Sequence, residues 1–291
     1  MTPLKFRDFL QTPIRQPLIM GILNVTPDSF SDGGQFLSVP AAVLAARSMV
    51  DAGADLIDIG AESTRPGAVP VPAIEQCRRL IPVVQALRSL GGLTISIDTT
   101  SSEVARACLD EGAHMVNDTS AGMNDAQMLP LIADRKVPVV LMHNQGSPAT
   151  LEAPPAYSDV VAEVKRFLRE RLDAARQAGC ADEQIIVDPG IGFGKTTAHN
   201  IQLLERLSEI TTLGRPVLLG TSRKRFIGEI THTDAPVDRV FGTAATIAWG
   251  VANGADILRV HDVGPMKQVV QMICAIQFSR KNGFAGGERG L

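Results

Sequence analysis

The stretch "AGADLIDIG" (52–60) joins the predicted end of a helix to the predicted start of a strand. Gly53 stands where a helix commonly ends in a left-handed residue, and the β-branched run after it is typical of a buried strand. Its first four residues, "AGAD" (52–55), recur in related form as "EGAH" (111–114) and "NGAD" (253–256), each time before another short apolar run. The repetition indicates one helix-to-strand unit that is used several times.

Similar runs alternate with longer amphipathic segments along most of the chain, which favours parallel strands joined by helices. The strand candidates span 17–24, 54–60, 93–98, 114–118, 137–143, 184–188, 216–220 and 256–261. Helices are expected near 39–52, 71–90, 102–111, 124–135, 158–178, 198–211, 239–253 and 264–281. Eight such units predict an α/β fold, a single closed (β/α)8 TIM barrel. An open doubly wound sheet is the alternative.

The composition is that of an ordinary globular protein rather than a disordered chain, with 45% hydrophobic and 20% charged residues. A net charge of −3 gives no reason to expect a nucleic-acid partner. The N-terminus lacks the apolar core of a signal peptide, and no apolar run approaches the roughly 18 residues of a membrane helix. We therefore expect a cytoplasmic protein without a membrane partner. The four scattered cysteines favour reduced thiols over a metal site.

One domain is expected, because no long linker or composition shift interrupts the chain. An N-terminal extension (1–16) precedes the catalytic barrel (17–282), and a glycine-rich, flexible tail (283–291) follows it. Two segments, 25–39 after the first strand and 61–72 after the second, are longer than a strand-to-helix connection requires. These two long loops are candidate lids over a site.

The segment "IIVDPGIGFGKT" (185–196) resembles a nucleotide-binding loop only in part. A phosphate loop would need glycine at Pro189, which has no N–H, and a dinucleotide loop would need glycine at Lys195. Asp188 would also repel phosphates. We therefore interpret Lys195 and Thr196 as surface or helix-start residues, and the glycines as positions where the backbone turns closely past a ligand.

Polar residues follow the predicted strands at the end where the active site of such a barrel lies. In chain order they are Asn24, Glu62, Thr64, Arg65, Asp98, Asn117, Asp118, His143, Asp188, Ser222, Arg223, Lys224, Arg259, His261 and Asp262, with Met142 beside them. We interpret Asp58, Asp118 and Asp262 as caps of helices or turns and leave them out of the catalytic set.

The chemistry of this set falls into two groups. Asp98, Asn117 and Asp188 offer acceptors and an amide to a flat heterocycle with an amino group and ring N–H donors, and Lys224 could donate to it. The second group is cationic or donor-rich and precedes a predicted helix N-terminus, which favours an anion. Its members are Asn24, Arg65, Arg259 and His261. The sequence suggests a ring at the centre and a phosphate or pyrophosphate at the rim.

Five segments together resemble the signature of the dihydropteroate synthase family, in the family's order and across nearly the whole chain. They are "ILNVTPDSFSDGG" (22–34), "DIGAESTRPG" (58–67), "DPGIGFGKT" (188–196), "TSRKRFIG" (221–228) and "RVHDV" (259–263). The resemblance implies a (β/α)8 barrel of folate biosynthesis. It implies an enzyme that joins 6-hydroxymethyl-7,8-dihydropterin pyrophosphate to p-aminobenzoate, giving 7,8-dihydropteroate and pyrophosphate, and a typical homodimer.

The resemblance also implies site roles. The pterin-binding positions are Asp98, Asn117, Met142, Asp188 and Lys224. Pyrophosphate is assigned to Asn24, Arg65, Arg259 and His261, with a Mg²⁺ cofactor near Asn24. The p-aminobenzoate positions are Phe30, Thr64, Arg65, Pro66, Phe193 and Ser222. Asp98, Lys224, Arg65 and Asp32 form the catalytic set, with Phe30 and Asp32 on a mobile first loop. Pyrophosphate would leave before the amine attacks, without a protein nucleophile.

Three positions depart from the family pattern. Ala61 stands where many members have glycine, Arg225 where serine is frequent, and "NDTSAG" (117–122) varies the exit of the fourth strand. Arg225 is expected at the edge of the p-aminobenzoate site, where it bears on affinity for that substrate and for sulfonamide mimics. The alternatives are a pterin-binding methyltransferase and a non-catalytic pterin-binding paralogue.

Overall fold

The computed structural model describes residues 1–12, 15–26, 38–62, 70–145 and 156–282. Its strands are β1 (Leu18–Asn24), β2 (Leu56–Gly60), β3 (Thr94–Asp98), β4 (Met115–Asp118), β5 (Val139–Met142), β6 (Ile185–Asp188), β7 (Leu218–Leu219) and β8 (Ile257–Val260). All are parallel, in the order β6-β5-β4-β3-β2-β1-β8-β7. A parallel bridge between Val187 and Val217 joins the two outer strands. The predicted barrel is confirmed, and the open sheet is excluded.

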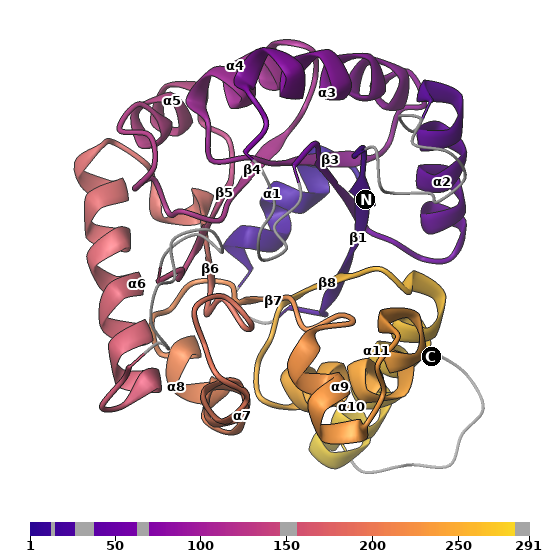
Figure 1. The fold of residues 1–291 in the computed structure, drawn as a ribbon, viewed down its shortest axis with the longest axis vertical. Coiled ribbons are helices and arrows are strands. Elements are labelled where there is room, and N and C mark those ends of the chain that lie inside the picture. Colours follow the sequence, from indigo (N-terminus) through magenta and orange to yellow (C-terminus); the bar gives the residue numbers. More distant parts are fainter. Residues whose placement is uncertain (13–14, 27–37, 63–69, 146–155, 283–291) are drawn as a thin grey trace.

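The helices surround the strands as a ring, except for the first, which lies inside the ring (Figure 1). They are α1 (Pro3–Gln11), α2 (Val39–Asp51), α3 (Ala73–Arg88), α4 (Ser102–Asp110), α5 (Met128–Arg135), α6 (Val160–Gln177), α7 (Thr197–Glu205), α8 (Leu207–Thr211), α9 (Arg225–Thr231), α10 (Val240–Ala252) and α11 (Val263–Asn282), with short 3-10 helices η2 (Asp182–Gln184) and η3 (Pro236–Arg239). The eight predicted helical segments are present, the sixth divided into α7 and α8. Helices α1 and α9 were not predicted. No described helix is long and apolar enough to cross a membrane.

The repeated four-residue phrase has the same structural role each time. Its glycine adopts a positive φ at Gly53, Gly112 and Gly254, as the sequence predicted. The last residue of each phrase then accepts a hydrogen bond from the backbone N–H of the neighbouring strand. The pairs are Ile19 N with Asp55 Oδ2 (3.0 Å), Ile95 N with His114 Nδ1 (3.1 Å) and Val217 N with Asp256 Oδ2 (2.9 Å). These bonds join neighbouring strands at the N-terminal end of the barrel.

Helix α1 lies across that same end, inside the ring of helices (Figure 1). Its Phe6 and Leu10 are buried in a cluster with apolar side chains that point into the barrel. The barrel members of this cluster are Leu18, Met20, Leu56, Met115, Val140, Ile186, Leu218 and Ile257. The N-terminal extension thus closes one end of the barrel with apolar side chains, which leaves the other end for a site.

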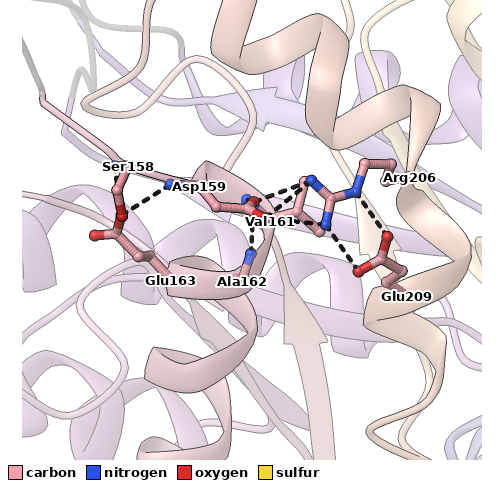
Figure 2. Close-up of polar contacts among 7 residues, drawn as sticks. All are labelled: Ser158, Asp159, Val161, Ala162, Glu163, Arg206 and Glu209. Carbon is pink, nitrogen blue, oxygen red and sulfur yellow. Dashed lines mark hydrogen bonds and ion pairs between the residues drawn. The ribbon is translucent and has the colours of Figure 1, made fainter.

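Helix α6 is fixed at its start by the N-cap Asp159, which accepts from Val161 N (3.0 Å) and Ala162 N (3.1 Å). Arg206, between α7 and α8, donates to Asp159 (3.0 Å) and to Glu209 (2.7 Å), as Figure 2 shows. Solvent screens ion pairs as exposed as these, so they add little to stability. Their role is to orient α6 against the α7–α8 junction.

Candidate active site

Along each of four strands, the side chain that faces the barrel interior is apolar at one position and polar two residues later. Because side chains of a strand alternate in direction, residues two apart face the same way. Four strands place an apolar residue at the closed end and a polar one above it: Leu56 and Asp58 on β2, Met115 and Asn117 on β4, Ile186 and Asp188 on β6, and Ile257 and Arg259 on β8. Near the carboxyl ends of the strands, these four polar side chains therefore form a layer, the polar floor, above the apolar core.

A cavity of about 1440 Å³ opens at this end. All ten predicted site residues that the structure describes border it: Asn24, Asp98, Asn117, Met142, Asp188, Phe193, Ser222, Lys224, Arg259 and His261. The other five predicted site residues, Phe30, Asp32, Thr64, Arg65 and Pro66, lie outside the described residues. The volume exceeds that of a typical small-molecule pocket and suits two substrates.

Arg259 is the centre of a buried polar network. Its Nε lies 2.6 Å from Asp58 Oδ2, and its Nη2 lies 2.6 Å from Asp98 Oδ2. Asn117 donates to the same Asp58 oxygen at 3.0 Å. From the sequence, Arg259 was expected in an anion site at the rim, whereas in the structure it binds Asp98, which was expected beside the ring. Arg259 thus lies between the two chemical groups.

Asp58 was left out of the catalytic set as a cap, and that interpretation is wrong. Its side chain is fully buried at the middle of β2 and binds Arg259 and Asn117. Within the described part of the chain, its Oδ1 is buried without a hydrogen-bond partner. Asp118 does stabilise a turn, as expected, by accepting from Ser120 N at 2.8 Å.

Asp98 ends β3, in register with Asn117 of β4. Burial raises the pKa of its carboxyl to about 7, although the charge of Arg259 acts to lower it. The nearby Asp58 raises the pKa further, because two carboxylates in one site repel each other. Asp98 is therefore an acceptor whose charge depends on pH near neutrality, as is common at functional sites.

Asp188 and Lys224 face each other across the cavity wall formed by the turn after β6. Burial raises the pKa of Asp188, with Lys224 as the largest opposing charge, and Gly190 N donates to Asp188 Oδ1 at 2.7 Å. Burial lowers the pKa of Lys224 to about 8, and Asp188 acts to raise it. The Lys224 ammonium donates to the carbonyl of Ile191 and lies 4.6 Å from the centroid of the Phe193 ring. Lys224 therefore interacts with both the Asp188 carboxylate and the aromatic face of Phe193.

Ser222 and His261 join the ends of strands β7 and β8. The Ser222 Oγ accepts from His261 N at 3.1 Å and lies 3.1 Å from His261 Nδ1. Between Ser222 and Lys224, Arg223 adopts a φ of +59°, unusual for a residue other than glycine. Its guanidinium holds Asp262 at 2.9 Å, which fixes the turn. This turn places Ser222 and Lys224 on the cavity wall.

Lys195 is half-buried and its ammonium is fully engaged, so it is not the freely exposed surface residue that the sequence suggested. Its Nζ lies 2.9 Å from Gly190 O, from Phe193 O and from His143 Nδ1. Thr196 is the N-cap of α7, as expected, and its side chain accepts from His199 N at 3.2 Å. The expected helix start at Thr196 is therefore confirmed, whereas the expected exposure of Lys195 is not.

Arg225 begins α9, the helix that the sequence did not reveal. It borders the cavity, but its side chain is 88% exposed and donates to Glu229 at 2.7 Å, one turn further along the helix. Its guanidinium is therefore directed along α9 in an exposed ion pair.

The sequence of the chain matches a known family over most of its length. The chain matches the pterin binding enzyme family over residues 20–261. The dihydropteroate synthase of Synechocystis sp. is 49% identical over 262 residues, which are 90% of this chain and 91% of that protein.

Two solved structures from Xanthomonas albilineans are similar in fold as well as in sequence. A dihydropteroate synthase with 4-aminobenzoic acid has a TM-score of 0.85 and 48% identity, covering 90% of this chain and 93% of that one. The structure in complex with 7,8-dihydropteroate has a TM-score of 0.82 and 46% identity, covering 91% and 95%. The chain therefore belongs to the pterin-binding enzyme family, within its dihydropteroate synthases.

Proposed function

We propose that the protein condenses 6-hydroxymethyl-7,8-dihydropterin pyrophosphate with p-aminobenzoate, giving 7,8-dihydropteroate and pyrophosphate for folate biosynthesis. The observation that carries this proposal is the single cavity bordered by acceptors for a ring, cations for an anion and an aromatic wall. The solved relatives with 4-aminobenzoic acid and 7,8-dihydropteroate support the same pair of ligand classes.

The pterin is proposed to lie on the polar floor of the barrel. Asp98, Asn117 and Asp188 come from three different strands and present oxygens that can accept from the amino group and ring N–H donors. Lys224 donates to a ring acceptor, and the apolar side chain of Met142, in register with Asp188, packs beside the ring. Each of these groups is held by the barrel itself, so little ordering is needed when the ring binds.

The pyrophosphate is proposed to bind beside Arg259 and His261. Arg259 presents a planar set of donors suited to phosphate oxygens, and His261 stands two residues before the N-terminus of α11, which favours an anion. Arg65 joins this group on the resemblance alone. In this proposal the charge that develops on the leaving group is stabilised where it forms.

A magnesium ion fits this site as a companion of the substrate. No group of three His, Cys, Asp or Glu side chains that could hold a metal occurs within the described residues. Mg²⁺ usually retains waters and takes one or two protein oxygens plus substrate phosphates. Asn24 ends β1 and borders the cavity, so its amide oxygen could hold the ion. When bound, Mg²⁺ would neutralise charge on the pyrophosphate.

The reaction is proposed to begin with loss of pyrophosphate. The bond between the pterin methylene carbon and the pyrophosphate oxygen breaks, and its electron pair leaves with the oxygen. The resulting cation is delocalised over the ring and lies near the Asp98 carboxylate. The amine of p-aminobenzoate then forms the C–N bond and releases a proton to solvent. The protein acts by positioning and electrostatic stabilisation, and no protein nucleophile is needed.

The second substrate is proposed to bind against Phe193 and Ser222. The Phe193 ring offers an apolar face, and the hydroxyl of Ser222 is near the cavity wall beside His261. Thr64, Pro66 and Phe30 complete this part of the proposal on the resemblance, and Asp32 with Arg65 would help exclude water from the cation.

A homodimer is also part of the proposal. Large apolar side chains are exposed on η3, α10 and α11; helix α10 packs against η3 and against α11, and α10 and α11 lie side by side in Figure 1. They include Val237, Phe241, Met272 and Ile276, with Phe241 85% exposed. Large apolar side chains exposed on neighbouring elements support an interface with a second copy of the chain. A cytoplasmic location fits the four free thiols, which are typical of a reducing compartment.

The test is turnover by the purified protein. With the pterin pyrophosphate, p-aminobenzoate and Mg²⁺, we expect equal amounts of dihydropteroate and pyrophosphate, and a loss of both with Asp188→Ala. Transfer of a methyl group from methyltetrahydrofolate to a corrinoid protein would favour the methyltransferase instead. Pterin binding without either reaction would indicate a non-catalytic paralogue.

A further inference from the structure

The turn that follows β6 depends on side chains for its shape. Three acceptors surround the ammonium of Lys195: Gly190 O, Phe193 O and His143 Nδ1, each at 2.9 Å. An ammonium has three donors, so this set can satisfy all of them. Lys195 therefore ties both ends of the four-residue segment 190–193 to a histidine of the preceding strand exit.

His143 is suited to this role by its surroundings. Burial, together with the charge of Lys195, lowers the pKa of its ring to about 3, so the ring is neutral and its Nδ1 can accept a hydrogen bond from the ammonium. The ring contacts Phe167 edge-on, with centroids 4.9 Å apart, and His143 N donates to Asp188 O at 2.9 Å. The acceptor is thus fixed in place by packing on α6 and by strand β6.

The remaining polar groups of the turn are also held by side chains. Tyr157 donates to Gly194 O at 3.0 Å, and Gly192 N donates to Asn200 Oδ1 at 2.7 Å. The glycines are required, because a side chain at Gly190 would lie 1.9 Å from the carbonyl oxygen of His143. Besides the backbone bond from Phe193 N to Gly190 O (3.1 Å), side chains therefore bind the polar groups along most of this turn.

Lys195 and Lys224 bind adjoining carbonyls of this turn. Lys195 binds Gly190 O and Phe193 O, whereas Lys224 binds the carbonyl of Ile191 and lies against the Phe193 ring. Loss of the Lys195 ammonium would leave carbonyls 190 and 193 without that donor. The Phe193 ring would then lose its fixed orientation, while Asp188 remains anchored to β6.

We infer that Lys195 is a positioning residue for the second substrate, acting through the backbone of the turn to orient Phe193. This inference rests on the proposed function, in which Phe193 borders p-aminobenzoate. It assigns to Lys195 an effect on binding of the aromatic amine rather than on binding of the pterin.

The test compares Lys195→Met with the wild type in steady-state kinetics. Methionine keeps a chain of similar length and removes all three donors. We expect the KM for p-aminobenzoate to rise at least tenfold, while the KM for the pterin pyrophosphate changes less than threefold. Lys195→Gln keeps two donors and should give a smaller rise, and it decides the question if Lys195→Met does not fold. Lys5→Met, at an exposed position of α1, is the matched control.

Two outcomes would overturn the inference. One is a kcat that falls with the folded fraction while the KM for p-aminobenzoate stays unchanged. The other is an equal rise in both KM values. If the wild type itself gives no dihydropteroate, the proposed function fails, whereas an active wild type with unaffected Lys195 variants removes only the role of Lys195.

Discussion

The two ends of the barrel use the same strands for opposite purposes. At the N-terminal end, Phe6 and Leu10 of α1 cover an apolar interior, and at the other end the partly buried Arg259 pairs with the buried Asp58 and with the partly buried Asp98. Buried apolar side chains contribute stability, whereas buried charges cost desolvation free energy that their pairing only partly offsets. The comparison indicates that the closed end stabilises a barrel whose open end is shaped for ligands.

The largest effect is expected at the open end, from Asp98→Ala. We predict that kcat falls by about 10²–10³-fold, as for other preorganised electrostatic groups. The raised pKa of Asp98 contributes stability that is fully present below its ordinary value of 3.8 and is lost as the pH rises through about 7. At pH 7.5 the free energy of unfolding of Asp98→Ala should therefore be no lower than that of the wild type. A large loss of stability with little loss of kcat would contradict the comparison.

The opposite result is expected at the closed end, from Phe6→Ala. Removal of a buried phenylalanine typically costs about 3–5 kcal/mol of stability, because a cavity remains. The kinetic constants of the folded fraction should be unchanged, since Phe6 belongs to the apolar cluster and not to the cavity wall. Denaturant unfolding and steady-state kinetics on the same sample check both statements. A change in KM would show that the two ends are coupled.

A third, smaller effect concerns pH. Asp98 loses its proton near pH 7 and Lys224 loses its charge near pH 8, so pterin affinity should be highest between these values. Below this window the acceptor is protonated, and above it the donor is neutral, so affinity should fall by up to about tenfold per pH unit on either side. Pterin dissociation constants from pH 5.5 to 9.5 test this. Lys224→Arg should remove the alkaline decrease, and a flat wild-type profile would refute the assignment.

The smallest effect is expected for Arg225→Ser. The exposed pair between Arg225 and Glu229 is worth only about 0.3–0.5 kcal/mol. The KM for p-aminobenzoate and the inhibition constant of a sulfonamide should each change less than about threefold. A tenfold change would show that Arg225 contacts the second substrate, contrary to its exposed orientation along α9.

Much of the barrel was predictable because its signals are local. Gly53 and the β-branched run after it lie within ten residues, and the polar residues at strand ends needed only the rule that parallel strands end on one side. The site residues Asp98, Asn117, Asp188 and Lys224 do border one cavity. The roles of these residues stay a prediction.

The features that could not be predicted from the sequence depend on residues far apart along the chain. Asp58 resembles a local cap until Arg259, 201 residues further along the chain, is placed beside it. Lys195 resembles a surface lysine because its acceptor His143 lies 52 residues away. The helix α1 gives little signal because only the closed barrel supplies the apolar surface that Phe6 covers.

The most direct test of the account is to bind the two halves of the first substrate separately. Isothermal titration with 6-hydroxymethylpterin and with pyrophosphate would be carried out on Asp188→Ala and His261→Ala. We predict that Asp188→Ala weakens pterin binding at least tenfold and leaves pyrophosphate within threefold, and that His261→Ala does the reverse. Equal weakening of both ligands in both variants would contradict the division of the open end into a ring site and an anion site.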